Sequence, residues 1–75
     1  MLKSITLQVI GDHRLVCEGC EERIEAMLKK LEGVNKVRAK ARSQRIEVLY
    51  DTSMLDPGAI AQRITEAGYQ TNVER

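Results

Sequence analysis

Residues 3–31 read KSITLQVIGDHRLVCEGCEERIEAMLKKL, and this stretch decides the fold. Its first part, residues 3–10, alternates polar and apolar side chains, which is the pattern of a half-buried strand. A polar break follows, and from Glu18 onward the apolar side chains recur at helical spacing. Acidic residues at the start of this helical segment and lysines at its end suit the helix dipole. The stretch therefore predicts a strand, a loop and a helix that stops near Gly33.

Two further strands are predicted immediately after this helix. Apolar and polar residues alternate over residues 34–42 and again over residues 46–50. Residues 42–45 between them are polar and predict a turn, although they lack the Asn-Gly pair of a tight hairpin.

The last third of the chain predicts a second helix and a fourth strand. Asp56 followed by Pro57 has the form of a helix N-cap with proline in the first position. Gly68 marks the end of this helix, and residues 69–73 form a short final strand.

The predicted order is strand, helix, strand, strand, helix, strand. Each strand-helix-strand half needs a right-handed crossover. The economical arrangement is an α+β fold, the ferredoxin-like βαββαβ sandwich, with a four-stranded antiparallel sheet and both helices on one face. A length of 75 residues predicts one domain over residues 1–75. Its core must be aliphatic, because the chain has neither Phe nor Trp.

Charge and hydropathy exclude several classes of function. The net charge is +1, from 12 basic and 11 acidic residues, so no general affinity for nucleic acid or for a membrane surface is expected. Basic residues do alternate over 36–42, but RNA-binding sheets of this topology stack bases on aromatic residues, and this face has none. No apolar run reaches the roughly 18 residues of a membrane span. No signal peptide is seen, so the predicted location is cytoplasmic.

Cys17 and Cys20 are the only cysteines, and their Cys-x-x-Cys spacing places them at the mouth of the first predicted helix. Thiolates are soft ligands that select Cu(I), Zn(II) and similar metals, and a helix N-terminus favours the thiolate form. Two sulfurs suit Cu(I), whereas structural zinc normally takes four ligands. The residues therefore predict a Cu(I) site at Cys17 and Cys20, with Zn(II), Cd(II) or Hg(II) as alternative cargoes.

A dithiol redox protein is the rival interpretation of the same two cysteines. Thioredoxin-like motifs also place a cysteine at a helix N-terminus. That fold needs a longer chain, however, and the single proline, Pro57, opens a helix rather than facing a redox pair. Redox chemistry is therefore the weaker hypothesis.

Further motif residues surround the cysteines along nearly the whole chain. They are Leu31-Glu32-Gly33-Val34 at the end of the first helix, Val48, Ile60, Ile64 and Ala67-Gly68-Tyr69 before the last strand. With these residues the chain resembles the heavy-metal-associated domain family, which includes copper chaperones, N-terminal domains of heavy-metal P-type ATPases and mercury-binding proteins. The resemblance implies the ferredoxin-like fold, metal held by Cys17 and Cys20, and transfer to a partner domain by cysteine exchange.

The approach to Cys17 departs from the pattern of the family. The family usually has Gly-Met-Thr before the first cysteine, whereas this chain has Arg14-Leu15-Val16. Leu15 can fill the volume of the methionine that packs under the loop. His13 adds an imidazole, which makes it a candidate third ligand. The resemblance also implies a role for Tyr69 beside the metal loop, because a tyrosine at this position shields the metal site in bacterial members of the family.

These observations lead to one functional prediction. The chain is expected to be a carrier of soft metal and not an enzyme, with a metal-transporting P-type ATPase or a similar acceptor as its partner. A metal-bridged homodimer is a second candidate assembly. An acidic cluster near the cysteines is a candidate docking surface for a basic partner: Glu18, Glu21, Glu22 and Glu25.

Overall fold

The computed structural model describes residues 1–11, 14–16 and 18–74. The elements follow the predicted order, and their bounds are β1 (Leu2–Ile10), α1 (Glu18–Lys29), β2 (Val34–Lys40), β3 (Arg45–Asp51), α2 (Pro57–Glu66) and β4 (Gln70–Glu74).

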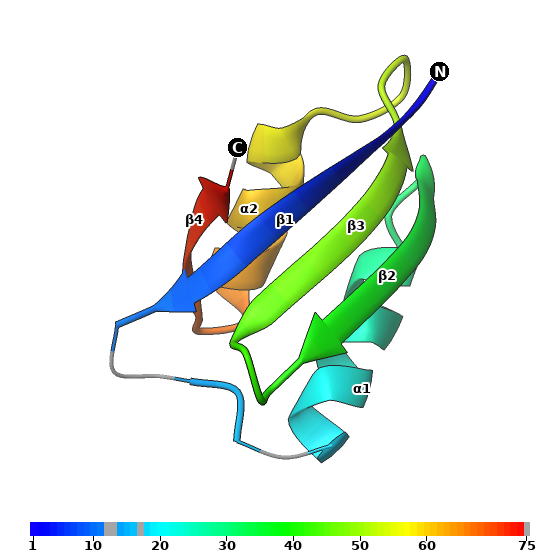
Figure 1. Ribbon diagram of the computed structural model, residues 1–75. Coiled ribbons are helices and arrows are strands. Elements are labelled where there is room, and N and C mark those ends of the chain that lie inside the picture. Colours follow the sequence, from blue (N-terminus) through cyan, green and yellow to red (C-terminus); the bar gives the residue numbers. More distant parts are fainter. Residues whose placement is uncertain (12–13, 17, 75) are drawn as a thin grey trace.

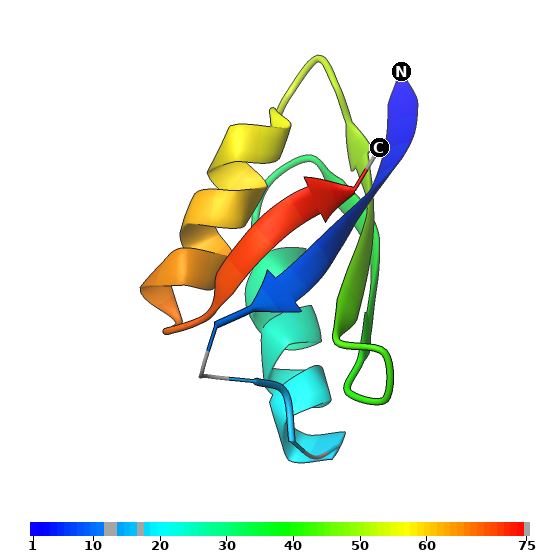
Figure 2. The ribbon, with the colours of Figure 1, turned by 60° about the vertical axis from the view of Figure 1, so that its left-hand side comes forward.

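The four strands form one sheet in the order β2-β3-β1-β4, and all neighbouring strands run antiparallel (Figure 1). Both helices cover the same face of this sheet, and the opposite face has no helix over it (Figure 2). The predicted ferredoxin-like arrangement is therefore confirmed.

β1 is the central strand that leads into the cysteine loop. It pairs with β3 along Leu2–Gln8 but with β4 only along Thr6–Ile10. The half of β1 next to the loop is consequently flanked on both sides, by β4 and by β3 or the β2–β3 turn. The described part of β4 leaves the first half of β1 paired on one side only.

The core lies between the sheet and the helices and is almost entirely aliphatic. Inward-facing positions alternate along β1, β2 and β3, as the sequence predicts, and they meet the apolar stripes of α1 and α2. The buried residues are Ile5, Leu7, Val9, Leu15, Ile24, Leu28, Val37, Ala39, Ile46, Val48, Tyr50, Ile60, Ile64 and Tyr69.

Two predicted boundaries extend too far. α1 ends at Lys29, and Gly33, with φ +102°, lies in the turn that leads to β2. β2 ends at Lys40 rather than at residue 42. In both places the apolar pattern continues past the regular element, because Leu31 and Ala41 pack against the core from the adjoining turns.

The start of α2 is as predicted. Asp56 is the N-cap, its Oδ1 accepts a hydrogen bond from the Ala59 N–H at 3.0 Å, and Pro57 occupies the first helical position. This cap satisfies one of the backbone N–H groups that the first turn of a helix leaves without a partner.

Candidate metal centre

Cys20 lies in the first turn of α1, as the sequence predicts. Its side chain is half-buried and packs against the core beneath the helix. Cys17 precedes α1 in the sequence, and both Cys17 and the candidate ligand His13 lie outside the described residues. The two-sulfur site at Cys17 and Cys20 thus stays a prediction that only the placement of Cys20 supports.

Leu15 connects the cysteine loop to the core. Its side chain is 2% exposed, whereas the neighbouring Val16 is 77% exposed. Leu15 therefore occupies buried volume under the loop, as expected for the residue that replaces the family's methionine.

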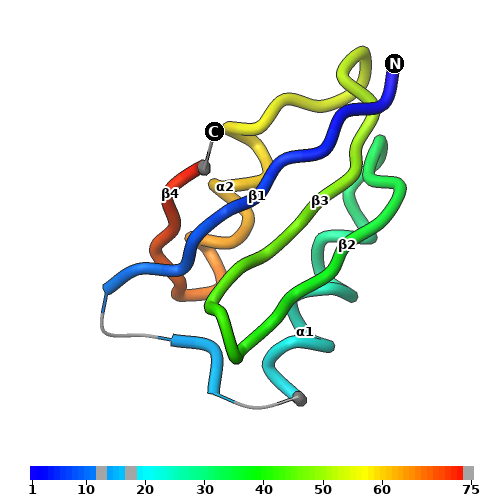
Figure 3. The backbone as a smooth tube through the Cα atoms, in the orientation of Figure 1, coloured from blue at the N-terminus to red at the C-terminus, as the bar shows by residue number. Residues whose placement is uncertain are grey.

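Gln44, in the turn between β2 and β3, holds the backbone of this same loop. Its Oε1 accepts a hydrogen bond from the Leu15 N–H at 2.9 Å, and its Nε2 donates to the Leu15 carbonyl at 2.6 Å. The turn and the loop lie at the same end of the sheet (Figure 3). No pattern in the sequence predicts this contact. The one signal in the sequence is that residues 42–45 predict a turn but lack Asn-Gly. Another residue must then adopt the left-handed backbone conformation of the turn, and in the structure this residue is Gln44.

Two glutamates of the acidic cluster have a structural role in this fold. Glu25 Oε2 accepts a hydrogen bond from the Ala39 N–H at 3.0 Å, and Glu21 Oε2 accepts one from the Ala41 N–H. Ala39 belongs to β2, which is an edge of the sheet. These carboxylates thus satisfy backbone donors of β2 and of the turn that follows it, and the docking surface stays a prediction. Glu22, by contrast, is exposed.

Tyr69 stands between α2 and β4 with a side chain that is 6% exposed. It belongs to the core cluster, as an aromatic residue at the edge of the core would. A role in shielding a metal ion stays a prediction.

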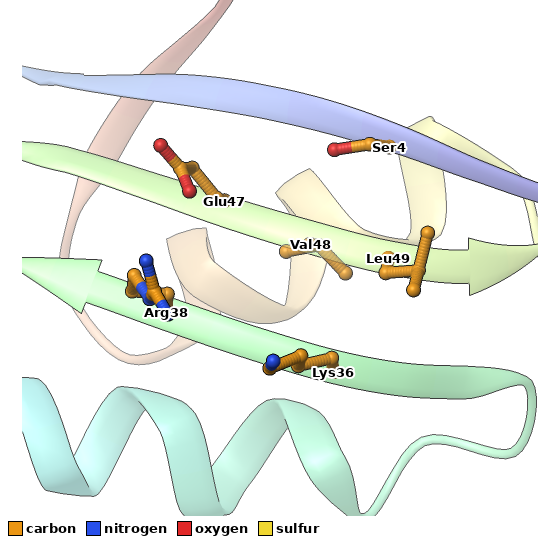
Figure 4. Close-up of a pocket in the computed structure, with 6 residues that line it drawn as sticks. All are labelled: Ser4, Lys36, Arg38, Glu47, Val48 and Leu49. Carbon is orange, nitrogen blue, oxygen red and sulfur yellow. The ribbon is translucent and has the colours of Figure 1, made fainter.

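The open face of the sheet carries a shallow hollow of about 250 Å³. Figure 4 shows Arg38 on β2 beside Glu47 on β3, and Lys36 further along β2 opposite Leu49. Because α1 lies on the other face, this hollow is separate from Cys20. Within residues 1–11, 14–16 and 18–74, no three His, Cys, Asp or Glu side chains are grouped closely enough to hold a metal ion. No helix in the described part of the chain is long and apolar enough to cross a membrane.

The structure defines a ferredoxin-like domain with Cys20 in the first turn of its first helix. The heavy-metal-associated domain model matches residues 13–70, and the chain belongs to this family.

Several named relatives of the chain are copper proteins. It is 33% identical to the copper chaperone CopZ of Enterococcus hirae over 57 residues, which are 76% of this chain and 83% of CopZ. It is 32% identical over 73 residues, 97% of its length, to a copper-exporting P-type ATPase of Bacillus subtilis, of which it spans 9%. The crystal structure of oxidized MerP from Ralstonia metallidurans has the same fold, with a TM-score of 0.87 and 24% identity over 100% of both chains.

Proposed function

We propose that this chain carries Cu(I) between Cys17 and Cys20 and transfers it to a second protein. The observation that carries the proposal is Cys20, half-buried in the first turn of α1 of a heavy-metal-associated domain, three positions after the other cysteine. Heavy-metal binding belongs to the family, and the choice of copper and of the acceptor is our inference.

The chemistry of the two thiolates fits a cargo that is handed on. A helix N-terminus favours thiolate over thiol, and thiolate is the form that binds metal. Two sulfur ligands leave Cu(I) open to a third. In the proposed transfer, a thiolate of the acceptor bonds to the ion and one Cu–S bond to this chain breaks. A second acceptor thiolate then displaces the other cysteine in the same way, and each displaced cysteine takes up a proton. The oxidation state of copper does not change, and no bond of an organic substrate is altered, so the proposed carrier is not an enzyme.

The relatives support copper as the cargo and an ATPase as the acceptor. CopZ is named a copper chaperone, and the ATPase of Bacillus subtilis is named copper-exporting. The proposed acceptor is therefore a metal-binding domain of a transport ATPase. We also propose a cytoplasmic location, because thiols that bind metal must stay reduced.

A titration of the reduced protein with Cu(I), against a competing chelator of known affinity, tests the cargo. We expect one equivalent to bind in the wild type. Cys17→Ser and Cys20→Ser should each lose tight binding, because a hydroxyl is a poor ligand for a soft ion. Circular dichroism should show that both variants remain folded. Binding of Cu(I) that survives in both variants would contradict the proposed site.

The alternative cargoes keep the same site and change the ion. Parallel titrations with Zn(II), Cd(II) and Hg(II) separate them, and His13→Ala tests a third ligand. Loss of Zn(II) binding but not of Cu(I) binding in His13→Ala would assign the imidazole to a divalent site. Tyr69→Phe tests the shielding role, through the rate at which the loaded protein releases Cu(I) to the chelator.

A dithiol redox protein is the rival class, and the same preparation tests it. The metal-free protein should not reduce a disulfide substrate catalytically with dithiothreitol as the electron donor. Multiple turnovers that require both cysteines would show that the protein is an oxidoreductase and would contradict the proposed role as a metal carrier.

A further inference from the structure

The β2–β3 turn and the loop before α1 are joined through one side chain. The amide of Gln44 accepts from the N–H of Leu15 and donates to the carbonyl of the same residue, at 2.9 and 2.6 Å. It thus pairs both backbone polar groups of a residue 29 positions away in the sequence. Leu15 stands two positions before Cys17.

The conformation of Gln44 is itself fixed by its surroundings. Its φ is +57°, the left-handed region that residues other than glycine and asparagine seldom adopt. Its Nε2 also donates to the carbonyl of Ala41 across the turn, and its own carbonyl accepts from the Val9 N–H at 2.7 Å. The amide is therefore presented to the loop in a defined position rather than as a mobile side chain.

Leu15 is the anchor of the described part of this loop. Its side chain is buried in the core and its backbone is clamped by Gln44, whereas Arg14 and Val16 on either side are exposed. Within residues 14–16, Leu15 is therefore held to the domain in two independent ways, through its side chain and through its backbone.

We propose that Gln44 is a positioning residue for metal binding, because it fixes the arm of the loop that leads to Cys17. A loop that is ordered before the ion arrives loses less conformational freedom on binding, and this raises the affinity. The expected effect on the affinity for metal rests on the proposed function. The hydrogen bonds between Gln44 and Leu15 are present in the metal-free protein. This role follows from the amide contacts of this chain.

The substitution Gln44→Gly removes the amide and keeps a residue that adopts positive φ without strain. We expect the Leu15 amide of the metal-free variant to exchange its hydrogen at least about fivefold faster than in the wild type, from the loss of two hydrogen bonds. The dissociation constant for Cu(I) should rise by at least about fivefold for the same reason. Glycine relieves the left-handed backbone conformation, and this offsets part of the stability lost with the three hydrogen bonds of the amide. Gln44→Glu keeps an oxygen acceptor for the Leu15 N–H but has no N–H donors, so it should raise the dissociation constant for Cu(I) through the lost bond to the Leu15 carbonyl.

Gln8→Ala is the matched control. Gln8 Nε2 donates to the carbonyls of Ser43 and Gln44 at 3.3 and 3.2 Å, so it contacts the same turn without contacting Leu15. We expect wild-type exchange at Leu15 and wild-type affinity for Cu(I) in this variant. Unchanged Leu15 exchange in Gln44→Gly, or faster exchange with unchanged affinity, would overturn the positioning role. If the wild type binds no Cu(I), the proposed function fails, and the positioning role for metal fails with it, whatever the exchange at Leu15 shows about the clamp.

Discussion

Gly33 shows how one backbone angle constrains the choice of residue. Its φ is +102°, and a Cβ built there would lie 3.0 Å from the Cβ of Met54 and 3.3 Å from that of Leu55. The Gly33 carbonyl also accepts a hydrogen bond from the Asp51 N–H at 2.7 Å, which ties the turn after α1 to the end of β3.

We therefore expect Gly33→Ala to be destabilising. The strained backbone and the close approach to Met54 should together lower the free energy of unfolding by more than about 1 kcal/mol. Urea denaturation monitored by circular dichroism measures this loss. A midpoint equal to that of the wild type would show that the turn relaxes without cost.

Asp51 predicts a pH dependence at the residue scale. Its Oδ1 accepts hydrogen bonds from the hydroxyl and the N–H of Ser53 at 2.7 and 2.9 Å, and the N-terminal ammonium lies 3.2 Å away. These groups, the Ser53 hydroxyl first, lower the pKa of Asp51 from 3.8 to about 2.

Because the pKa of Asp51 is lower in the folded protein, the ionised carboxylate stabilises the fold above pH 3.8, and this contribution disappears as the pH falls through about 2. Thermal melts of the wild type and Asp51→Asn between these limits should converge as the acid protonates Asp51. A difference between them that does not depend on pH would contradict this account.

At the scale of elements, α1 protects the edge of the sheet. Glu21 and Glu25 are one helical turn apart, and their carboxylates accept the N–H groups of Ala41 and Ala39, respectively. An unpaired strand edge is a template for pairing with another chain, so this contact has a consequence for association as well as for stability.

We expect Glu25→Ala to leave the Ala39 N–H without its acceptor and to lower the free energy of unfolding by about 1–3 kcal/mol. Glu22→Ala is the control, because Glu22 lies on the same helix and is exposed. Chemical denaturation checks the stability, and light scattering checks association. Equal effects of the two substitutions would mean that helix charge, rather than the strand edge, is responsible.

Local signals predicted the elements, and contacts distant in sequence account for what was missed. Alternation in β1 and the Asp56-Pro57 pair act within a few residues, so a sequence pattern can display them. The amide of Gln44 reaches Leu15, 29 positions away, and Glu21 reaches Ala41, 20 positions away. Such hydrogen bonds leave no periodic signature in the chain. The cysteine pair was conspicuous from its spacing, whereas the residues that support its loop were not.

At the scale of the whole molecule, one small core stabilises everything described above. Leu28 is completely buried on α1 and belongs to the cluster shared by both helices and the sheet. Small domains unfold as a unit, so a substitution at one position of the core lowers the stability of the whole domain.

Leu28→Ala should lower the free energy of unfolding by about 2–5 kcal/mol, through lost burial and the cavity that remains. That is a large part of the roughly 5–15 kcal/mol available to a typical domain. Val16→Ala, at an exposed position, should change it by less than about 0.5 kcal/mol. Urea titrations of the two variants test this contrast, and similar midpoints would show that Leu28 is not central to the core.

The uneven pairing of β1 gives the sheet a gradient of rigidity. Thr6 to Gln8 are held between β3 and β4, while Leu2 to Ile5 have β3 alone among the described residues. Thermal fraying should therefore begin at the far end of the strand and decay before it reaches the loop. We therefore expect backbone amides of Thr6 to Gln8 to exchange more slowly than those of Leu2 to Ile5.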